Sequence, residues 1–315
     1  MPKILLKNKS GLMDVTHMVS EITWSGSQDE VARKLELNFL YPLHDHYAPK
    51  VYPNIGEQLF LYDDNHIELF QGRVFYNERL GEQGTIQITA YDDAIRLAKS
   101  KGTYNFKGKT AEAITKIVCN DLGVEIGELA PTGIPQKILC NGIGMYEIIS
   151  KAYDGVSKQN KKKYNIEIRQ GKLCVDETGN EVVEPLISSD TNILESSYSE
   201  NAEEVINRVK ICDEKDQYLG VVEDKELIDL VGVFQDVYTK EQDKQAGTVA
   251  SNMLKGIDKC IEISTIGNVE YRTGRIVKIQ DSATKIEQLF DITGDSHTWN
   301  NSHYETKLVL DVVEI

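Results

Sequence analysis

The chain has 315 residues, a hydrophobic content of 40% and a formal net charge of −15. The length predicts about two domains, with three possible, and the composition is that of an ordinary globular protein. The charge argues against a duplex-binding surface, because such surfaces carry a basic patch and like charge repels nucleic acid. The basic run at residues 158–163, KQNKKK, is typical of a solvated loop.

Cysteine usage and apolar runs indicate where the protein is made. The five cysteines are widely spaced and contain no CxxC pair, which argues against a disulfide scaffold or a zinc ribbon. Cys119, Cys174 and Cys212 sit beside apolar residues, as buried free thiols do. The apolar run near the N-terminus is too short for a signal peptide, and no segment reaches the roughly 20 apolar residues that span a bilayer. We therefore expect synthesis in a cytoplasm and no membrane contact.

Residues 1 to about 54 are predicted to be β structure with long loops. Ile22 and Trp24 share one face of a strand, and the stretch LELNFL at residues 35–40 alternates in the same way. His44 and His46 would share one face of a strand, which is compatible with joint metal ligation. Two histidines fall short of the three or four ligands of a zinc site, so a proline-bounded polar loop is the favoured interpretation.

The stretch from residue 56 to residue 97 carries the clearest β signal. Its period-two alternation is broken by clusters of Asp, Asn and Gly, which predicts antiparallel strands with one buried face. In the last of these strands Ile86, Ile88 and Ala90 share a face, and a short helix follows. We therefore predict that residues 1–100 form a first β module.

Residues 101–190 are predicted to form a small α/β domain. An apolar stripe at helical spacing includes Ile114, Ile117 and Val118, which should face the core of this domain. Thr110 is a suitable N-cap for this helix, and Gly123 ends it. The further elements predicted here are a helix that carries Met145 and Ala152 on its apolar face and stops at Gly155, and a hairpin that turns at Gln170-Gly171.

Residues 191–315 are predicted to form a second β module with a helical insertion near 225–258. Within it, the stretch GRIV from Gly274 echoes the stretch GRVF from Gly72. Downstream, Ile292 echoes Ile88, at a spacing of 18 residues against 16. The echo favours two similar β modules at opposite ends of the chain, and the alternative is a chance likeness between two hairpins.

Two sequence patterns resemble functional sites, one for phosphate binding and one for glycoside hydrolysis, but neither meets the requirements of its chemistry. The stretch from Gly102 to Thr110, GTYNFKGKT, resembles a phosphate-binding P-loop but has five residues between its glycines where the motif needs four. Adjacent carboxylates would suit a glycosidase only if two of them faced each other across a cleft, and 50 acidic residues produce such pairs by chance. The pairs are Asp63-Asp64, Asp92-Asp93, Glu203-Glu204 and Glu223-Asp224. We predict no catalytic, cofactor-binding or metal-binding residues.

The order of these pieces resembles a known family. The signal lies in the order of elements and in the stretches FQGRV from Phe70, GKTAE from Gly108, GKL from Gly171 and NRV from Asn207. Together they resemble the phage late-control protein D family and the XkdQ/YqbQ-like tail hub proteins of contractile prophage tails and phage-tail-like bacteriocins. The resemblance covers nearly the whole chain, although no single motif is diagnostic.

The resemblance implies a structural baseplate hub and no enzyme. It implies a mainly β, α+β fold with two tube-like antiparallel β-barrel domains flanking the small α/β domain. Such hubs form homotrimers that adapt a six-fold tail tube to a three-fold spike, with the tube or its initiator, the spike, and tape-measure and LysM-type baseplate proteins as neighbours. The expected location is the bacterial cytoplasm during assembly and then the baseplate of a virion or bacteriocin tail.

Two alternatives remain open from the sequence. One is a tail-associated peptidoglycan hydrolase, because some hub-like chains carry an added lytic domain, although the closing predicted strand lies near the last residue and we expect no such domain here. The other is a carbohydrate-binding β module, which would need exposed clustered aromatics. Only Trp24 and Trp299 are tryptophans, although 15 tyrosines weaken that objection.

Overall fold

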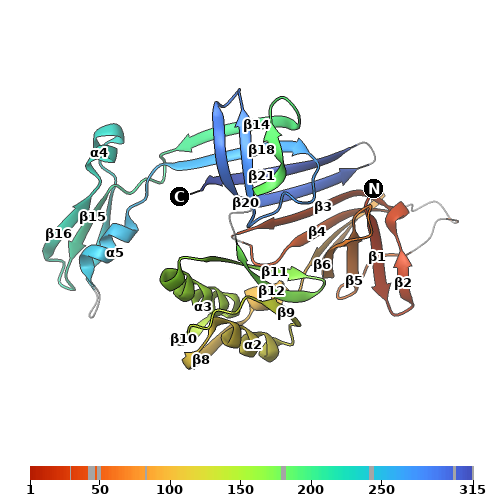
Figure 1. The fold of residues 1–315 in the computed structure, drawn as a ribbon, viewed down its shortest axis with the longest axis horizontal. Helices are drawn as coiled ribbons and strands as arrows, with labels where there is room; N and C mark the ends of the chain where they lie inside the picture. Colours follow the sequence, from red (N-terminus) through yellow and green to blue (C-terminus); the bar gives the residue numbers. More distant parts are fainter. Residues whose placement is uncertain are drawn as a thin grey trace. The chain divides into compact units, whose positions relative to one another are not determined.

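The computed structural model describes residues 1–28, 30–41, 47, 51–81, 84–178, 182–240, 245–300 and 303–313. Strands dominate this part of the chain (Figure 1), so the mainly β, α+β class predicted from the sequence is confirmed. Two compact units form, one from Met1–Ser196 with Glu262–Ile315 and the other from Ser197–Ile261. The domain boundaries expected at residues 100 and 190 stay predictions.

One large sheet contains thirteen of the described strands. Its order is β14-β18-β21-β20-β3-β4-β7-β6-β5-β1-β2, with β19 also beside β20 and β13 beside β19. Its strands are β1 (Lys3–Asn8), β2 (Gly11–Asp14), β3 (Val19–Ser27), β4 (Lys34–Leu40), β5 (Gln58–Tyr62), β6 (Glu68–Leu80), β7 (Thr85–Tyr91), β13 (Val182–Ser188), β14 (Ile193–Asn201), β18 (Asp258–Ile266), β19 (Ile276–Asp281), β20 (Ile286–Asn300) and β21 (Tyr304–Val312). A 3₁₀ turn, η1 (Thr16–Met18), precedes β3.

Strand β20 joins the two β modules. Along one edge its first part pairs with β19, where Ile276 lies opposite Asp291, and its second part pairs with β3, where Trp24 lies opposite His297. Along the other edge it pairs with β21. The expectation of two separate barrels is therefore not confirmed, because strands of both modules belong to one sheet. The reason is length, since the 15 residues of β20 reach past the 6 of β19 and along the 9 of β3.

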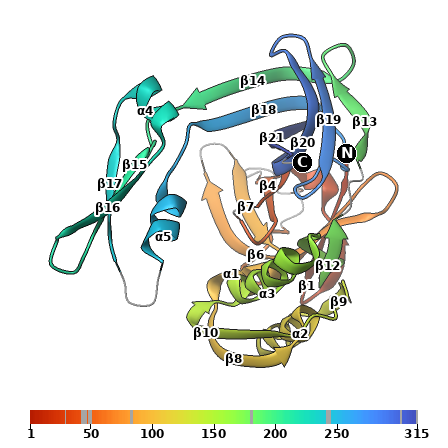
Figure 2. The same cartoon turned by 60° about the vertical axis from the view of Figure 1, so that its left-hand side comes forward.

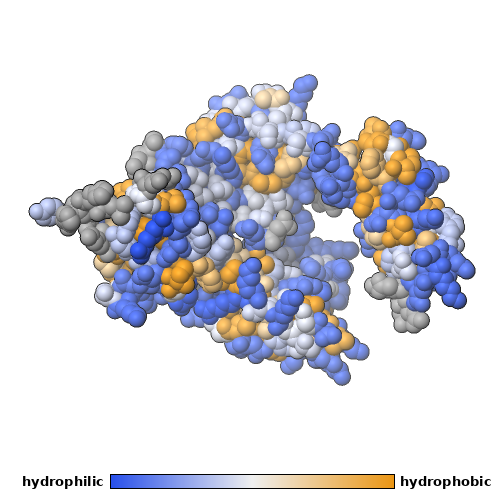
Figure 3. Space-filling view, turned by 180° about the vertical axis from the view of Figure 1, so that it is seen from behind, coloured by the Kyte–Doolittle hydropathy of each residue, from blue (hydrophilic) through white to orange (hydrophobic). Residues whose placement is uncertain are grey.

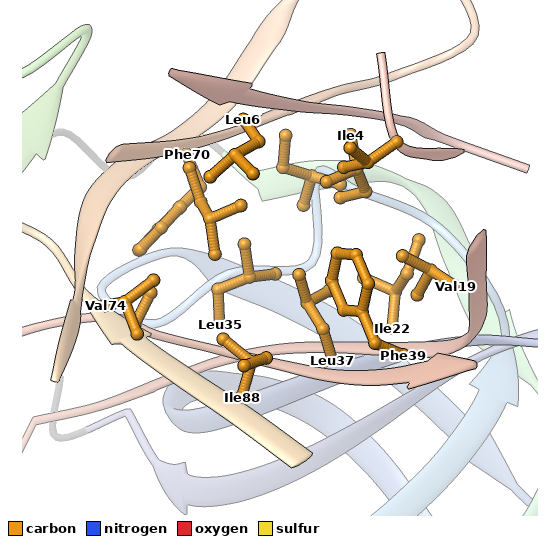
Figure 4. Packing of buried hydrophobic residues seen from close by; sticks show 14 of the residues in the cluster. Ile4, Leu6, Val19, Ile22, Leu35, Leu37, Phe39, Phe70, Val74 and Ile88 are labelled. Carbon is orange, nitrogen blue, oxygen red and sulfur yellow. The ribbon is translucent and has the colours of Figure 1, made fainter. Parts of the chain in front are cut away.

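The first β module encloses an apolar core. In β4 the side chains of Leu35, Leu37 and Phe39 are buried, while the residues between them are half-exposed. This alternation follows from the two-residue period of a strand and was visible in the sequence. Across the interior lie Ile4 and Leu6 from β1, and the labelled side chains point toward one another (Figure 4).

The middle of the chain forms a second core around two helices. Its elements are α1 (Ala94–Lys99), β8 (Lys101–Lys109), α2 (Ala111–Leu122), β9 (Ile126–Leu129), β10 (Gln136–Gly144), α3 (Met145–Asn160), β11 (Lys163–Arg169) and β12 (Lys172–Thr178). Ile114 and Val118 are buried as predicted, and Ile117 is half-buried beside this core. Thr110 occupies the N-cap position without a capping hydrogen bond from its side chain, and Gly123 ends α2 in the left-handed conformation.

Helix α3 does not stop at Gly155, where the sequence had predicted its end. The helix continues to Asn160, and Lys161 takes the left-handed C-cap conformation. Gly155 serves close packing instead, because a Cβ there would lie 2.2 Å from Gln136 Oε1. The amide of Gln136 also donates to the Ala152 carbonyl at 2.5 Å. A glycine can therefore mark a close approach as well as a helix end.

The unit at residues 197–261 is a three-stranded sheet with two short helices. Its elements are β15 (Arg208–Cys212), β16 (Tyr218–Glu223), α4 (Lys225–Val231), β17 (Gln235–Thr239) and α5 (Ala246–Met253). The sheet order is β16-β15-β17, and Val209, Ile211 and Tyr238 pack with Ala250 of α5 in its core. No helix in the described part of the chain combines the length and apolar character needed to cross a bilayer.

Candidate functional site at the junction of the two β modules

A buried ion pair lies where β20 meets β3. The Arg33 Nη1 donates to Asp295 Oδ1 at 3.0 Å, and its Nη2 donates to Asp295 Oδ2. Arg33 precedes β4 and also lies over the Trp24 ring, with its guanidinium carbon 4.1 Å from the ring centroid. The Asp295 side chain is fully buried. The pair therefore connects the turn between β3 and β4 with β20, across 262 positions of sequence.

Asp295 has further donors that compensate for its burial. The Thr273 backbone N and the Thr273 hydroxyl each donate to Asp295 Oδ1 at 2.7 Å. Burial is the largest single influence and would raise the pKa of Asp295, but the charges and hydrogen bonds of Arg33 and His297 together outweigh it and hold the pKa well below its usual range. Asp295 is thus a carboxylate at neutral pH, with both oxygens occupied. Charge-assisted bonds in this bidentate geometry are the strong ones.

His297 continues the polar cluster along β20. Its Nε2 lies 3.2 Å from Asp295 Oδ2, and its Nδ1 lies 2.9 Å from the Tyr304 hydroxyl and 3.1 Å from the Thr306 hydroxyl. The imidazole is also close to the Trp24 ring, with 5.0 Å between centroids. Burial lowers the pKa of His297 more than the nearby Asp295 raises it, so the ring is neutral at neutral pH.

The backbone of Arg33 is held by a second buried acid. Asp92, just after β7, accepts hydrogen bonds from the Arg33 N at 3.2 Å and from the Ala94 N at 3.0 Å. Burial raises the pKa of Asp92 to about 7. Arg33 is therefore fixed by Asp92 through its main chain and by Asp295 through its side chain. The arrangement suits a structural clamp, because these polar groups are engaged with one another.

Sequence reasoning missed this cluster, although one signal for it existed. Asp295 and His297 occupy alternate positions of β20, in phase with the buried Trp299. A charged residue in phase with a buried apolar face requires a partner, because an unpaired buried charge is costly. The partner, Arg33, could not be identified from spacing.

The residues considered for metal or phosphate binding do not form a binding site in the described part of the chain. His44 and His46 lie outside the described residues. Over the described part of the chain no group of three His, Cys, Asp or Glu side chains could hold a metal. The P-loop-like stretch forms strand β8, paired antiparallel with β10.

Three further residues of the acidic pairs have individual structural partners. Asp63 accepts from the backbone N of Asn65 and of Ile67, which fixes a turn. Asp224 caps α4 by accepting from the Leu227 N at 3.0 Å, and Glu223 lies 2.6 Å from Arg208 in an ion pair.

The cysteines and the basic run show no sign of a functional site in the described residues. The cysteines are free thiols, and two lysines of the run form ion pairs. All five cysteines are free, and the expected burial of Cys119, Cys174 and Cys212 is confirmed. In the basic run Lys162 pairs with Glu177 at 2.8 Å and Lys163 with Asp291 at 3.5 Å.

Comparison with known proteins identifies the family. The family model described as YQBQ-like matches residues 22–311, so the chain belongs to the YQBQ-like family. The resemblance to XkdQ/YqbQ-like proteins inferred from the sequence is thereby confirmed. Phage-like element PBSX protein XkdQ of Bacillus subtilis (strain 168) is 26% identical over 258 residues, which cover 78% of each chain.

Two solved structures share the fold. The 43 kDa tail protein of prophage MuSo2 from Shewanella oneidensis superposes with a TM-score of 0.73 at 14% identity, over 99% of this chain and 97% of that one. The E. coli c3393 protein, described as a type VI secretion component structurally similar to the T4 tail proteins gp27 and gp5, gives a TM-score of 0.52 at 8% identity. That match covers 94% of this chain and 74% of the c3393 chain.

Proposed function

We propose that this chain is a structural component of the baseplate hub in a contractile phage tail or a related tail-like particle. Membership of the YQBQ-like family and the likeness to a prophage tail protein support a tail component. The likeness to c3393, which is itself described as similar to T4 tail proteins, supports the hub of a contractile system. Its place would be the bacterial cytoplasm during assembly and the baseplate afterwards.

The observation that carries the proposal is the pair of β modules that share β20. Hairpin β6–β7 belongs to the first module and hairpin β19–β20 to the second, and both lie in one sheet. A homotrimer would then present six wall segments, which is the number needed to continue a six-fold tube while keeping a three-fold face for a spike. In this proposal each module is a segment of one tube-like wall, with the domain at residues 101–190 between them.

The edges of the sheet favour assembly between copies. The main path of the described sheet is open, with β2 at one end and β14 at the other, and β13 ends the branch beside β19. Unpaired strand edges are a liability that proteins cover or pair. Because β2 and β14 belong to different modules, a contact between β2 of one copy and β14 of the next would be heterologous and could close a ring.

The proposed role is non-enzymatic, with no cofactor, and its partners would be proteins of the tail. These are the tail tube or its initiator, the spike, and tape-measure and LysM-type baseplate proteins. The alternative of a peptidoglycan hydrolase gains no support from the acidic pairs, since Asp63, Glu223 and Asp224 serve a turn, an ion pair and a helix cap.

Solution mass and tail stoichiometry test the proposal. We expect purified protein to sediment at three times its 35.5 kDa mass, and a complex with the spike partner to contain three copies of this chain. Quantitative mass spectrometry of purified tails should give three copies for each spike trimer. A protein that stays monomeric with the spike and is absent from tails would contradict the hub role. Turnover of cell walls in a zymogram would instead favour the hydrolase.

A further inference from the structure

The two-stranded ribbon formed by β8 and β10 carries an exposed basic face. Its two strands contain no acidic residue, although the chain as a whole has a net charge of −15. Four of its lysines are exposed, and none of them has an ion-pair partner within the described residues: Lys101, Lys107, Lys109 and Lys137. The other side of the ribbon packs beside α2 and α3 (Figure 2), with Phe106 and Cys140 buried there.

The arrangement of these lysines is unfavourable for the isolated chain. Lys107 and Lys137 are direct cross-strand partners, and like charges placed directly opposite destabilise a strand pair. The next pair on this face is Asn105 opposite Leu139, and Leu139 is 75% exposed. The ribbon face therefore combines an exposed apolar side chain with surrounding positive charge, which is the anatomy of a protein contact with a charged rim.

A second surface, on and just after α4, also combines exposed apolar side chains with charge, and its charge is negative. Helix α4 buries none of its side chains, and Leu230 on it is 70% exposed. Val233 and Phe234, just after the helix, are also exposed. Figure 3 shows hydrophobic side chains gathered at the end of this unit where α4 lies. Glu226 and Asp229 stand three positions apart on the helix, so they share a face with each other and with Leu230.

Helix α4 is fixed in place even though it is uncovered. The buried Asn207 donates from its side-chain amide to the Gly232 carbonyl at 2.7 Å and accepts from the Phe234 N at 2.8 Å. At the other end of the helix, the Asp224 N donates to the Asn207 carbonyl at 2.9 Å. One residue thus secures both ends of an element that buries none of its side chains. Exposed apolar side chains gathered in this way mark an interaction site.

We propose that the basic ribbon of one copy docks on the acidic α4 surface, defined as residues 224–234, of a second copy of this chain. Leu139 would meet the apolar group around Leu230, while the lysines of the ribbon meet Glu226 and Asp229. A second copy is the occupant favoured by charge, because each chain offers both surfaces and they are complementary in sign. The inference rests on the proposed hub function and names a surface through which its copies meet.

Charge reversal on full-length protein tests the contact. The first variant is Lys107→Glu with Lys137→Glu, which keeps a like-charge pair in the ribbon. The second variant is Glu226→Lys with Asp229→Lys. Sedimentation equilibrium at increasing salt measures self-association of each variant. We expect either variant to weaken self-association by about tenfold or more, because like charges then face each other across the contact.

The chain that carries all four substitutions is the decisive variant. Its ribbon is acidic and its α4 surface is basic, so we expect self-association to return to within a few-fold of wild type. The matched control is Lys116→Glu with Lys158→Glu, which reverses two exposed lysines on α2 and α3 of the same domain and should leave association unchanged. Far-UV circular dichroism and melting of each variant separate a lost contact from a lost fold.

Three results would overturn the inference. They are a wild-type chain that stays monomeric at every concentration, a fourfold variant that associates no better than the two double variants, and heparin binding that depends on Lys107 and Lys137 while self-association does not. The proposed function is tested apart from this contact, by incorporation into tails. A chain that enters tails in three copies despite both reversals leaves the hub role standing and removes this interface.

Discussion

The interior of the first β module and the junction with β20 lie on neighbouring strands of one sheet but are built differently. The interior is apolar throughout, with Leu35 and Leu37 of β4 buried among other aliphatic and aromatic side chains. The junction buries Asp295 and His297 instead, together with the Arg33 guanidinium. One region stabilises the fold by removing apolar surface from water, and the other by specific charge-assisted bonds.

The two regions differ in how strictly they fix the register of the sheet. Apolar burial is non-directional, so it accepts many arrangements of similar volume. A shift of β20 along β3 by one residue would turn Asp295 and His297 to the opposite face and leave Arg33 without its partner. The junction therefore selects one pairing between segments that are far apart in the sequence. Four experiments probe this comparison.

The largest effect is expected at the junction. Replacing Asp295 with Ala leaves the Arg33 guanidinium without its carboxylate, and breaking such a buried pair costs about 3–5 kcal/mol of unfolding free energy. The loss should be complete at pH 7, because the folded pKa lies below the ordinary value of 3.8 and the contribution disappears only as pH falls through that range. Urea denaturation measures it.

The control for this experiment is Glu287→Ala, an exposed position on the same strand, which should change stability by less than about 0.5 kcal/mol. Equal losses for the two variants would show that the ion pair contributes nothing specific.

The apolar interior should respond with a similar but pH-independent loss. Leu37→Ala removes a side chain that is 2% exposed and leaves a cavity, which costs about 2–5 kcal/mol. Because Leu37 does not titrate, the loss measured by urea denaturation should be the same at pH 5 and pH 8. A loss that varied strongly with pH would mean that the interior and the junction unfold as coupled parts.

A pH-dependent effect is expected at Asp92. Burial raises its pKa from 3.8 to about 7, so between these values the folded state binds a proton that the unfolded state has released. Stability through this group is therefore highest at low pH and falls as pH rises toward 7, by up to about 1.4 kcal/mol per pH unit. Asp92→Asn lacks this slope, and parallel denaturation series at pH 4 to 8 measure it. Identical slopes for the two proteins would exclude the raised pKa.

The smallest effect is expected on the outer side of the same strand pair. Thr23 and Thr298 are direct cross-strand partners, and their hydroxyl oxygens lie 3.4 Å apart. Thr298→Val keeps the β-branched shape and removes the hydroxyl, which should cost about 0.2–1 kcal/mol. Thermal unfolding measures this loss of stability, and Thr298→Ser, which keeps the hydroxyl, is the control. A loss as large as that of Asp295→Ala would contradict the expectation that the outer face of the strand pair contributes less than the buried face.

Local patterns in the sequence predicted the local parts of the fold. The burial of Ile86, Ile88 and Ala90 follows from period-two alternation, and the buried positions of α2 follow from helical spacing. Glycine was harder to interpret. Gly72 lies within β6, where a Cβ would meet the Tyr91 carbonyl, whereas Gly274 lies in a turn at a φ of 85°. Glycine therefore occurs in the two similar stretches for different reasons, a close backbone contact at Gly72 and a left-handed backbone conformation at Gly274.

The junction and the α4 surface could not be predicted in this way. Strand β20 reads as one edge of a hairpin, and nothing local reveals that it also pairs with β3. The partner of Asp295 lies 262 positions away, and a single sequence contains no signal that connects such positions. Helix α4 was predicted only as part of a helical insertion, and none of its side chains is buried.

The sharing of β20 also sets an order of events during synthesis. Strand β3 leaves the ribosome long before the segment that covers its edge, because the two sides of the junction are 262 residues apart. At translation rates of about 5–20 residues per second, that edge waits on the order of 10–50 s for its neighbour. During this interval Trp24 and the backbone groups of β3 have no β20 beside them. We therefore expect the nascent chain to depend on chaperones at this stage, because the edge of β3 is uncovered. Pairing with β20 then covers that edge.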